Sequence, residues 1–185
     1  MSVNAPNDIL GSKASNFFLK NVDTEFYSLN SLKGKNGTVI SFICNHCPYV
    51  ISIIQRLNFE SKELKKIGIN TIAIMSNDSA QYPEDSFDNM VKFAKKYNFE
   101  FPYLHDEKQE IAYKYGAVCT PDIFGFNNSN LLQYRGRIDS GVMGLKNDII
   151  NRELYQAMKK IKSTGVGPNE QFNSFGCSIK WKKSE

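Results

Sequence analysis

The sequence has few cysteines and prolines and no long hydrophobic segment. It contains four cysteines and six prolines in 185 residues. Four cysteines are too few for the disulfide framework of a small secreted domain, and no stretch reaches the roughly 18 apolar residues of a membrane-spanning helix. The first residues, Met-Ser-Val-Asn-Ala-Pro, lack the basic and apolar regions of a secretory signal peptide. We therefore expect a cytoplasmic protein without a membrane partner.

The chain also lacks a concentrated excess of charge of either sign. Its 23 lysine and arginine residues stand against 19 acidic residues, a net charge of +4. The densest basic cluster is Lys180, Lys182 and Lys183 near the C-terminus. Nucleic-acid binding usually needs a concentrated basic face, so we expect no nucleic-acid partner. Hydrophobic residues make up 41% of the chain, which is too much for a disordered protein.

Two hydrophobic periods alternate along the sequence. Apolar, β-branched runs at 38–43 and 69–75 are typical of strands buried on both faces. Apolar positions three and four residues apart predict helices. The expected elements are, in order, a short hairpin (16–19 and 26–27), a helical turn or loop (28–35), a strand (38–43), a helix (47–68), a strand (69–75), helices (84–98 and 107–115), a hairpin (123–126 and 131–134) and a final helix (146–162).

This order of elements predicts an α/β fold. Strands that alternate with helices form parallel pairs through right-handed crossovers, and the closing hairpin adds antiparallel strands. We expect a mixed central β-sheet with helices on both faces, an N-terminal β extension and an irregular C-terminal tail. The predicted domain covers residues 1–164, and residues 165–185 form a tail packed on it or trailing from it.

The segment Cys44-Asn-His-Cys47 lies where the first buried strand gives way to the long helix. The first turn of a helix has unpaired N–H groups and the positive end of the helix dipole, which stabilise a thiolate. Cysteines with a lowered pKa occur at such places. We predict Cys44 to be the more exposed, nucleophilic cysteine and Cys47, one turn inside the helix, to be the resolving one. Pro48 fits this register because a missing N–H in the first turn breaks no helical hydrogen bond.

His46 lies between the two cysteines. A protonated imidazole there would stabilise the Cys44 thiolate and make the disulfide more oxidising; the alternative is a solvated histidine without influence. The cysteine pair also has two other interpretations: half of a zinc site completed by Cys119, Cys177 or His105, or two buried inert thiols. A zinc site usually needs a second such motif, and the sequence has none.

The segment Val118-Cys-Thr-Pro121 precedes an apolar run. Its Thr-Pro bond is either a cis proline at a strand start or an ordinary trans proline, and local sequence favours the trans form.

The motifs together resemble a known superfamily. A Cys-x-x-Cys after a buried strand, followed about seventy residues later by Thr-Pro and a hairpin, is similar to the thioredoxin fold. Residues 26–35, 39–43 and 135–139 resemble the redoxin branch, the alkyl hydroperoxide reductase and thiol-specific antioxidant group. The ending at 176–181 resembles that of peroxiredoxin-like thioredoxin-family proteins. The resemblance covers about residues 8–163 and the tail.

The resemblance implies that the Thr120–Pro121 bond is cis and faces Cys44. The backbone of Thr120 would then pair with an extended substrate segment, as a short added strand.

The sequence also departs from its relatives. Thioredoxins usually carry Gly-Pro between their cysteines, where this chain has Asn45-His46, and they carry a buried acid where it has Thr38. Peroxiredoxins place a proline and a Thr or Ser before the reactive cysteine; counting from Cys44, Ser41 fits but Gly37 replaces the proline. The arginine that orients a peroxide would be Arg135 or Arg137.

Two cysteines remain outside the motif. Cys119 flanks the proposed substrate loop, where it is either a modulating thiol or a buried strand-end residue. Cys177 is either an extra resolving cysteine or part of a tail that packs through Phe175, Ile179 and Trp181.

The favoured function is a thiol–disulfide oxidoreductase that uses Cys44 and Cys47 and needs no bound cofactor. Its partners would be a protein or small-molecule disulfide and an external thiol reductant. One alternative is a thiol-dependent peroxidase in which Cys44 attacks a hydroperoxide and Cys47 resolves the sulfenic acid. The second alternative is a non-enzymatic redox-sensing module.

Overall fold

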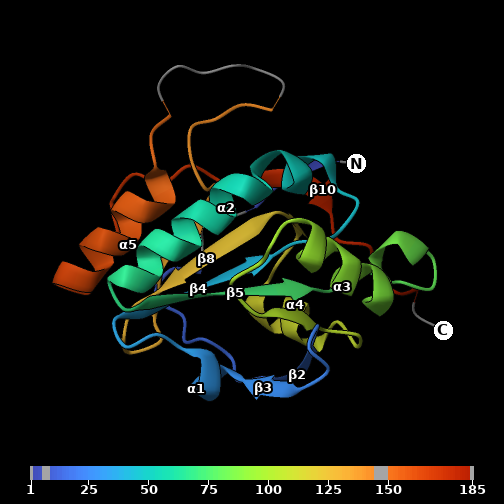
Figure 1. The fold of residues 1–185 in the computed structure, drawn as a ribbon. Coiled ribbons are helices and arrows are strands. Elements are labelled where there is room, and N and C mark those ends of the chain that lie inside the picture. Colours follow the sequence, from blue (N-terminus) through green and yellow to red (C-terminus); the bar gives the residue numbers. More distant parts are fainter. Residues whose placement is uncertain (1, 6–8, 144–149, 184–185) are drawn as a thin grey trace.

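A mixed seven-stranded sheet forms the centre of the computed structural model, which describes residues 2–5, 9–143 and 150–183 (Figure 1). The strand order is β3-β2-β6-β5-β4-β8-β9. Strands β4, β5 and β6 run parallel, whereas β8 is antiparallel to β4 and β2 is antiparallel to β6. The strands are β2 (Phe18–Asn21), β3 (Phe26–Ser28), β4 (Gly37–Phe42), β5 (Ile69–Met75), β6 (Tyr103–His105), β8 (Asp122–Phe126) and β9 (Leu132–Gly136).

Strand β4 is buried along its whole length because both faces of the sheet are covered. Its side chains alternate between two hydrophobic cores, with Val39 in one and Ile40 and Phe42 in the other. This alternation follows from the two-residue period of a strand. The continuous apolar run at 38–43 therefore indicates a strand buried on both faces, as predicted.

Helices cover both faces of the sheet (Figure 1). Side chains of α2, α3 and α5 enter one core, and side chains of α1 and α4 enter the other. The predicted α/β class, with a mixed sheet between helices, is confirmed. The helices are α1 (Leu29–Leu32), α2 (Pro48–Lys66), α3 (Phe87–Lys96), α4 (Glu110–Tyr115) and α5 (Glu153–Thr164), with a 3-10 turn η1 at Pro83–Asp85.

A second, three-stranded sheet joins the two ends of the chain to the domain. Its order is β1 (Ser2–Asn4), β10 (Phe175–Ser178) and β7 (Cys119–Thr120), all antiparallel. The sequence predicted none of these three strands, because each is short and has no partner nearby in the chain. The prediction of an irregular C-terminal tail is therefore wrong at Phe175–Ser178, which form a strand paired with the domain.

Two further predictions need correction, and the sequence missed one strand. The helix expected at 84–98 is divided, because Ser86 has extended backbone angles between η1 and α3. Strand β6 was not predicted, as it has only three residues. The helix expected at 146–162 begins at Glu153, because backbone groups of Asn151 and Leu154 bond to the loop after β9; its first part, 146–149, lies outside the described residues.

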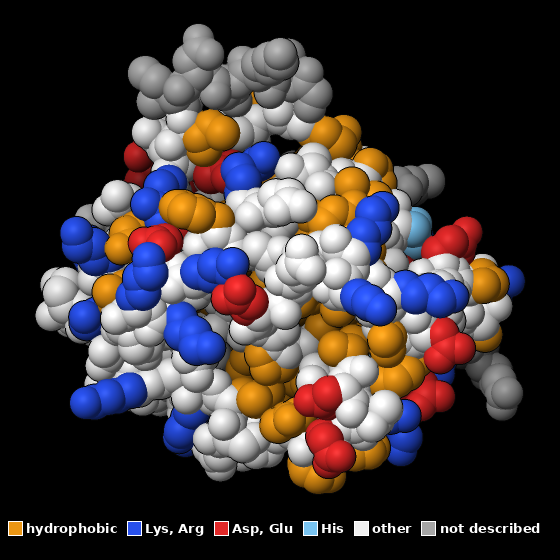
Figure 2. Space-filling view, in the orientation of Figure 1, with side chains coloured by type: hydrophobic (Ala, Val, Ile, Leu, Met, Phe, Trp, Pro, Cys, Tyr) orange, Lys and Arg blue, Asp and Glu red, His pale blue; other side chains and the backbone are white. Residues whose placement is uncertain are grey.

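The described helices include none that is both long and apolar enough to cross a membrane. On the face shown in Figure 2, basic and acidic side chains are interspersed, with hydrophobic side chains between them.

Candidate active site at the strand–helix junction

The two cysteines of the motif lie between β4 and α2. Strand β4 ends at Phe42 and α2 begins at Pro48, so Cys47 is the N-cap residue of the helix and Cys44 lies in the connecting loop. Pro48 occupies the first helical turn, where its missing N–H breaks no helical bond. The prediction that Cys47 lies one turn inside the helix is therefore wrong: Cys47, not Cys44, occupies the end of the helix.

Both cysteine side chains are fully buried, each with 0% of its surface exposed. The prediction that Cys44 is the more exposed sulfur is wrong. Its sulfur is in hydrogen-bond contact with Thr120 Oγ1 at 3.3 Å, and Cys47 Sγ lies 3.1 Å from the carbonyl oxygen of Thr120, to which its protonated thiol donates. A residue far away in the sequence therefore covers the pair.

The peptide bond between Thr120 and Pro121 is cis. The expectation from the family resemblance is confirmed, and the trans form favoured by local sequence is wrong. Thr120 faces both cysteines, so the structure brings four predicted site residues together: Cys44, Cys47, Thr120 and Pro121.

The pKa values of the two cysteines shift in opposite directions, and the shift favours a thiolate on Cys47. The hydrogen bond from the Cys44 thiol lowers the pKa of Cys47 to about 5 against the opposing effect of burial, and Cys177 and the N–H of Val50 assist. The same hydrogen bond raises the pKa of Cys44, and burial and the charge of Asp85 add to that rise. This direction is opposite to the lowered pKa that the sequence led us to expect at Cys44.

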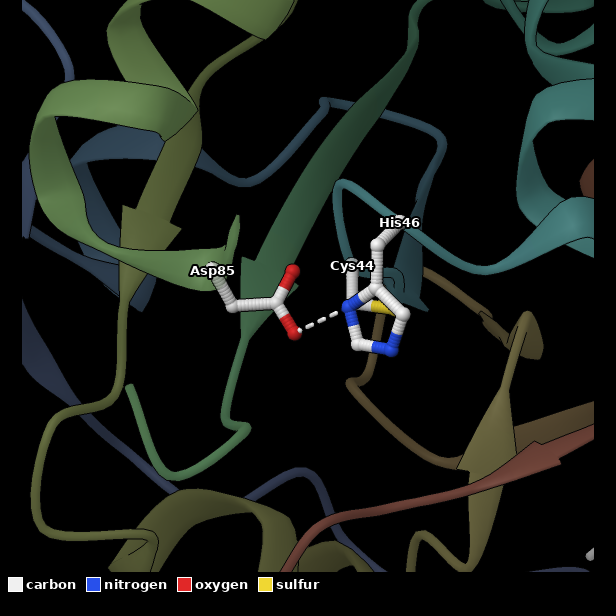
Figure 3. Close-up of side chains that lie close together, drawn as sticks. All are labelled: Cys44, His46 and Asp85. Atoms are coloured by element: carbon white, nitrogen blue, oxygen red, sulfur yellow. Dashed lines mark ion pairs between the residues drawn. The ribbon is translucent and has the colours of Figure 1, made fainter. Parts of the chain in front are cut away.

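Asp85 is a site residue that the sequence did not reveal. It is fully buried, and its carboxylate accepts hydrogen bonds from the N–H of Asn45 (2.8 Å) and the side chain of Asn77 (2.7 Å). His46 Nδ1 lies 2.8 Å from Asp85 Oδ2 (Figure 3). The imidazole also stacks on Tyr82. Asp85 follows a proline and a glutamate at an expected helix start, where acidic residues are common, so no local signal distinguishes it.

This arrangement changes the expected role of His46. The carboxylate of Asp85 pairs with the imidazole and, through its negative charge, raises the pKa of Cys44. The stabilising effect that His46 would have on a Cys44 thiolate is therefore opposed by its own partner.

Cys44, His46 and Asp85 also form a possible metal-binding group. Their ligand atoms all lie within 4.8 Å of one another. This set offers three of the four ligands that structural zinc usually takes, and it differs from the predicted set. Two residues that the sequence suggested as further zinc ligands have other contacts. Cys119 is buried and its thiol donates to the carbonyl of Pro121, and His105 packs against Phe87.

Both arginines that the sequence suggested for orienting a peroxide form ion pairs with carboxylates. Arg135 is buried and forms an ion pair with Asp122 at 2.8 Å, and Arg137 forms one with Glu153 at 2.7 Å. Thr38, at the place of the thioredoxin acid, accepts a hydrogen bond from the N–H of Gly34.

The edge that the resemblance assigned to a substrate is occupied by the chain's own C-terminal strand. Strand β10 pairs with β7 so that Cys177 lies opposite Thr120. Nothing in the local sequence predicted this pairing, because its partners lie far apart in the chain.

Comparison with known proteins places these features in a family. The model of the AhpC/TSA family matches residues 10–139. Peroxiredoxin Q from the chloroplast of Oryza sativa subsp. japonica is 29% identical over 115 residues, 62% of this chain and 48% of that protein. The chain thus spans about half the length of the first curated relatives it matches. The thiol-disulfide oxidoreductase ResA of Bacillus cereus is 25% identical over 153 residues, 82% of this chain and 78% of that protein.

Solved structures show the same architecture. An uncharacterized conserved protein from Geobacillus kaustophilus is 38% identical, with a TM-score of 0.94 and coverage of 100% of this chain and 98% of that one. The thioredoxin domain of a thiol-disulfide oxidoreductase from Bacteroides vulgatus, at 14% identity, has a TM-score of 0.63 over 82% of this chain and 96% of that one, which shows the fold alone. With its thioredoxin-like fold and a family match over most of its length, this chain belongs to the AhpC/TSA family.

Proposed function

We propose that the protein is a thiol–disulfide oxidoreductase whose redox group is the pair Cys44 and Cys47. The observation that carries this proposal is the placement of both sulfurs against Thr120, beside the cis Thr120–Pro121 bond, at the start of α2. Its substrate would be a protein or small-molecule disulfide, and an external thiol would restore the dithiol.

The chemistry follows from the position of the thiolate. The Cys47 thiolate attacks one sulfur of the substrate disulfide, forming a mixed disulfide and expelling the first substrate thiolate. Cys44 then loses its proton and attacks Cys47 Sγ, closing the Cys44–Cys47 bond and expelling the second substrate thiolate. Asp85 is the carboxylate beside Cys44, within 4.8 Å, and is the group that would accept this proton. These roles reverse those expected from the sequence.

Reduction of insulin in the presence of dithiothreitol tests this proposal. We expect catalysis by the wild-type protein and by Cys119→Ser, the matched control for a buried thiol outside the pair. Cys47→Ser would abolish catalysis, and Cys44→Ser would stop after one mixed disulfide, visible by mass spectrometry. Equal activity of Cys47→Ser and the wild type would refute the proposal. Zinc bound in a one-to-one ratio to Cys44, His46 and Asp85 in the purified protein would refute it as well.

A thiol-dependent peroxidase is the second candidate. It is favoured by the lowered pKa of Cys47 and by the similarity to a protein named peroxiredoxin Q. In this reaction the Cys47 thiolate attacks a hydroperoxide, releasing an alcohol or water and leaving a sulfenic acid, and Cys44 condenses with it and releases water. Stopped-flow oxidation by hydrogen peroxide separates the candidates: a rate far above that of free cysteine favours the peroxidase.

A further inference from the structure

The C-terminal strand β10 brings a third sulfur to the active-site pair. Cys177 lies directly opposite Thr120 in the antiparallel pairing of β10 with β7. The residue before it, Gly176, allows this close approach, because a Cβ there would clash with the carbonyl oxygen of Thr120. Cys177 thus occupies the place that an extended peptide would take when it adds a strand at this edge.

Contacts on both sides fix the position of Cys177. Before it, β1 pairs with β10, and the N–H of Ala5 donates to the carbonyl of Ser174. After it, the N–H of Ile179 donates to the carbonyl of Val118, and the ring of Trp181 stacks on Tyr113 with centroids 4.1 Å apart. The tail is therefore docked in register across the active site.

Cys177 is packed close to the active-site pair. Burial raises the pKa of Cys177 to about 11. Cys177 also packs against the core that contains Cys44 and Cys47. Cys177 therefore lies opposite Thr120, the residue that contacts the sulfurs of both Cys44 and Cys47.

Their exposure differs in a way that matters for electron transfer. Cys44 and Cys47 are fully buried, whereas Cys177 is partly exposed. An external thiol that approaches the folded protein would therefore reach Cys177 before it reaches either cysteine of the pair.

We propose that Cys177 is a third redox-active cysteine, which relays electrons from external thiols to the buried Cys44–Cys47 pair. In the exchange step, the Cys177 thiolate attacks Cys47 Sγ of the Cys44–Cys47 disulfide, a Cys47–Cys177 disulfide forms, and Cys44 leaves as a thiolate that takes up a proton. This step needs no added oxidant, because one disulfide replaces another. An external thiolate then attacks Cys177 Sγ, expels the Cys47 thiolate and forms a mixed disulfide, which a second thiol molecule reduces.

This relay rests on the proposed redox function of the pair, but its first test does not depend on that activity. Cys44→Ser is oxidised with diamide, its free thiols are blocked, and the protein is digested with trypsin. We expect a disulfide between peptides 36–56 and 163–180, which carry Cys47 and Cys177. The link should be lost in Cys44→Ser/Cys177→Ser, and peptide 115–135, which carries Cys119, should stay unlinked as the matched control.

The outcomes distinguish the two proposals. If the wild type closes Cys44–Cys47 but Cys44→Ser forms no link to Cys177, or links Cys119 equally, the relay is wrong and the redox function stands. If the wild type closes no Cys44–Cys47 disulfide, the redox function fails.

A kinetic measurement tests the direction of the relay. Cys177→Ser should still close the Cys44–Cys47 disulfide in a single turnover, but its reduction by dithiothreitol should be slower than that of the wild type. Equal or faster reduction would show that β10 merely covers the pair, and would overturn the relay.

Discussion

At the scale of single residues, the chemistry depends on which sulfur carries the charge. Cys47 is the N-cap of α2 and accepts hydrogen bonds from other thiols, whereas Cys44 lies beside the carboxylate of Asp85. A donor and a helix end stabilise a thiolate, and a neighbouring negative charge destabilises one. The Cys-x-x-Cys spacing alone cannot distinguish these environments.

Titration of thiolate absorbance at 240 nm checks this assignment. We expect one thiolate to form near pH 5 in the reduced protein, because the pKa of Cys47 is lowered to about 5 whereas those of Cys44, Cys119 and Cys177 are raised. Cys44→Ala should move this step to higher pH, because the Cys44 thiol is the strongest donor to Cys47. Cys119→Ala should leave it in place. A step that persists in Cys47→Ser would assign the thiolate to another sulfur.

At the scale of elements, the short strands at the chain ends decide access to the site. Strand β10 lies between β1 and β7 and covers the edge at Thr120. A strand of four residues has few side chains with which to define its register. The close backbone approach at Gly176 therefore contributes strongly to its placement.

Gly176→Ala tests the role of this close approach. The new methyl group would clash with the backbone of Thr120, which cannot move as easily as a side chain. We expect β10 to detach and the free energy of unfolding to fall by about 1–3 kcal/mol, the usual cost of overpacking. Iodoacetamide should then modify Cys47 faster than in the wild type.

Ser178→Ala is the control within the same strand, because the Ser178 side chain is only partly buried and contacts Lys180. It should change neither urea stability nor the rate of alkylation. Unchanged alkylation in Gly176→Ala would mean that β10 does not control access.

At the scale of the whole molecule, the lowered pKa of Cys47 leads us to expect that the fold stabilises the reduced form. The reduced protein holds the Cys47 thiolate among two thiols and backbone N–H groups, and closing a Cys44–Cys47 disulfide removes this arrangement. A disulfide whose reduced form is stabilised by folding is oxidising and easily reduced. The four-residue loop that it closes adds little stability through chain entropy.

We therefore expect the oxidised protein to melt at a lower temperature than the reduced protein, measured by calorimetry with and without reductant.

The sign of the pH dependence of this difference follows from the lowered pKa of Cys47. The folded reduced protein carries one proton fewer than the unfolded chain between about pH 5 and the ordinary cysteine pKa, so its stability rises with pH across this window. The difference in melting temperature should shrink as the pH falls toward 5.

The variant Cys44→Ser/Cys47→Ser is the control for this measurement, because it lacks the pair and should show a smaller redox difference. An oxidised wild-type protein that melts above the reduced one would contradict a stabilised thiolate.

Much of the fold follows from short stretches of sequence. Strands β4 and β5 and helix α2 appear as clear changes of hydrophobic period, because side chains i and i+2 share a strand face while i, i+3 and i+4 share a helix face. The position of the cysteine motif between β4 and α2 follows from these periods. Asp85 could not be found in this way, because its burial depends on contacts with Asn45 and Asn77.

The sequence by itself determined the α/β class, the order of the main elements and the cysteine pair at a strand–helix junction. The tertiary structure alone decided that Cys47 lies at the helix end, that both cysteines are buried, and that Cys177 lies opposite Thr120. Thr120 contacts Cys44 from 76 positions away in the chain. Burial and pKa depend on such long-range neighbours, whereas hydrophobic period depends only on residues a few positions apart.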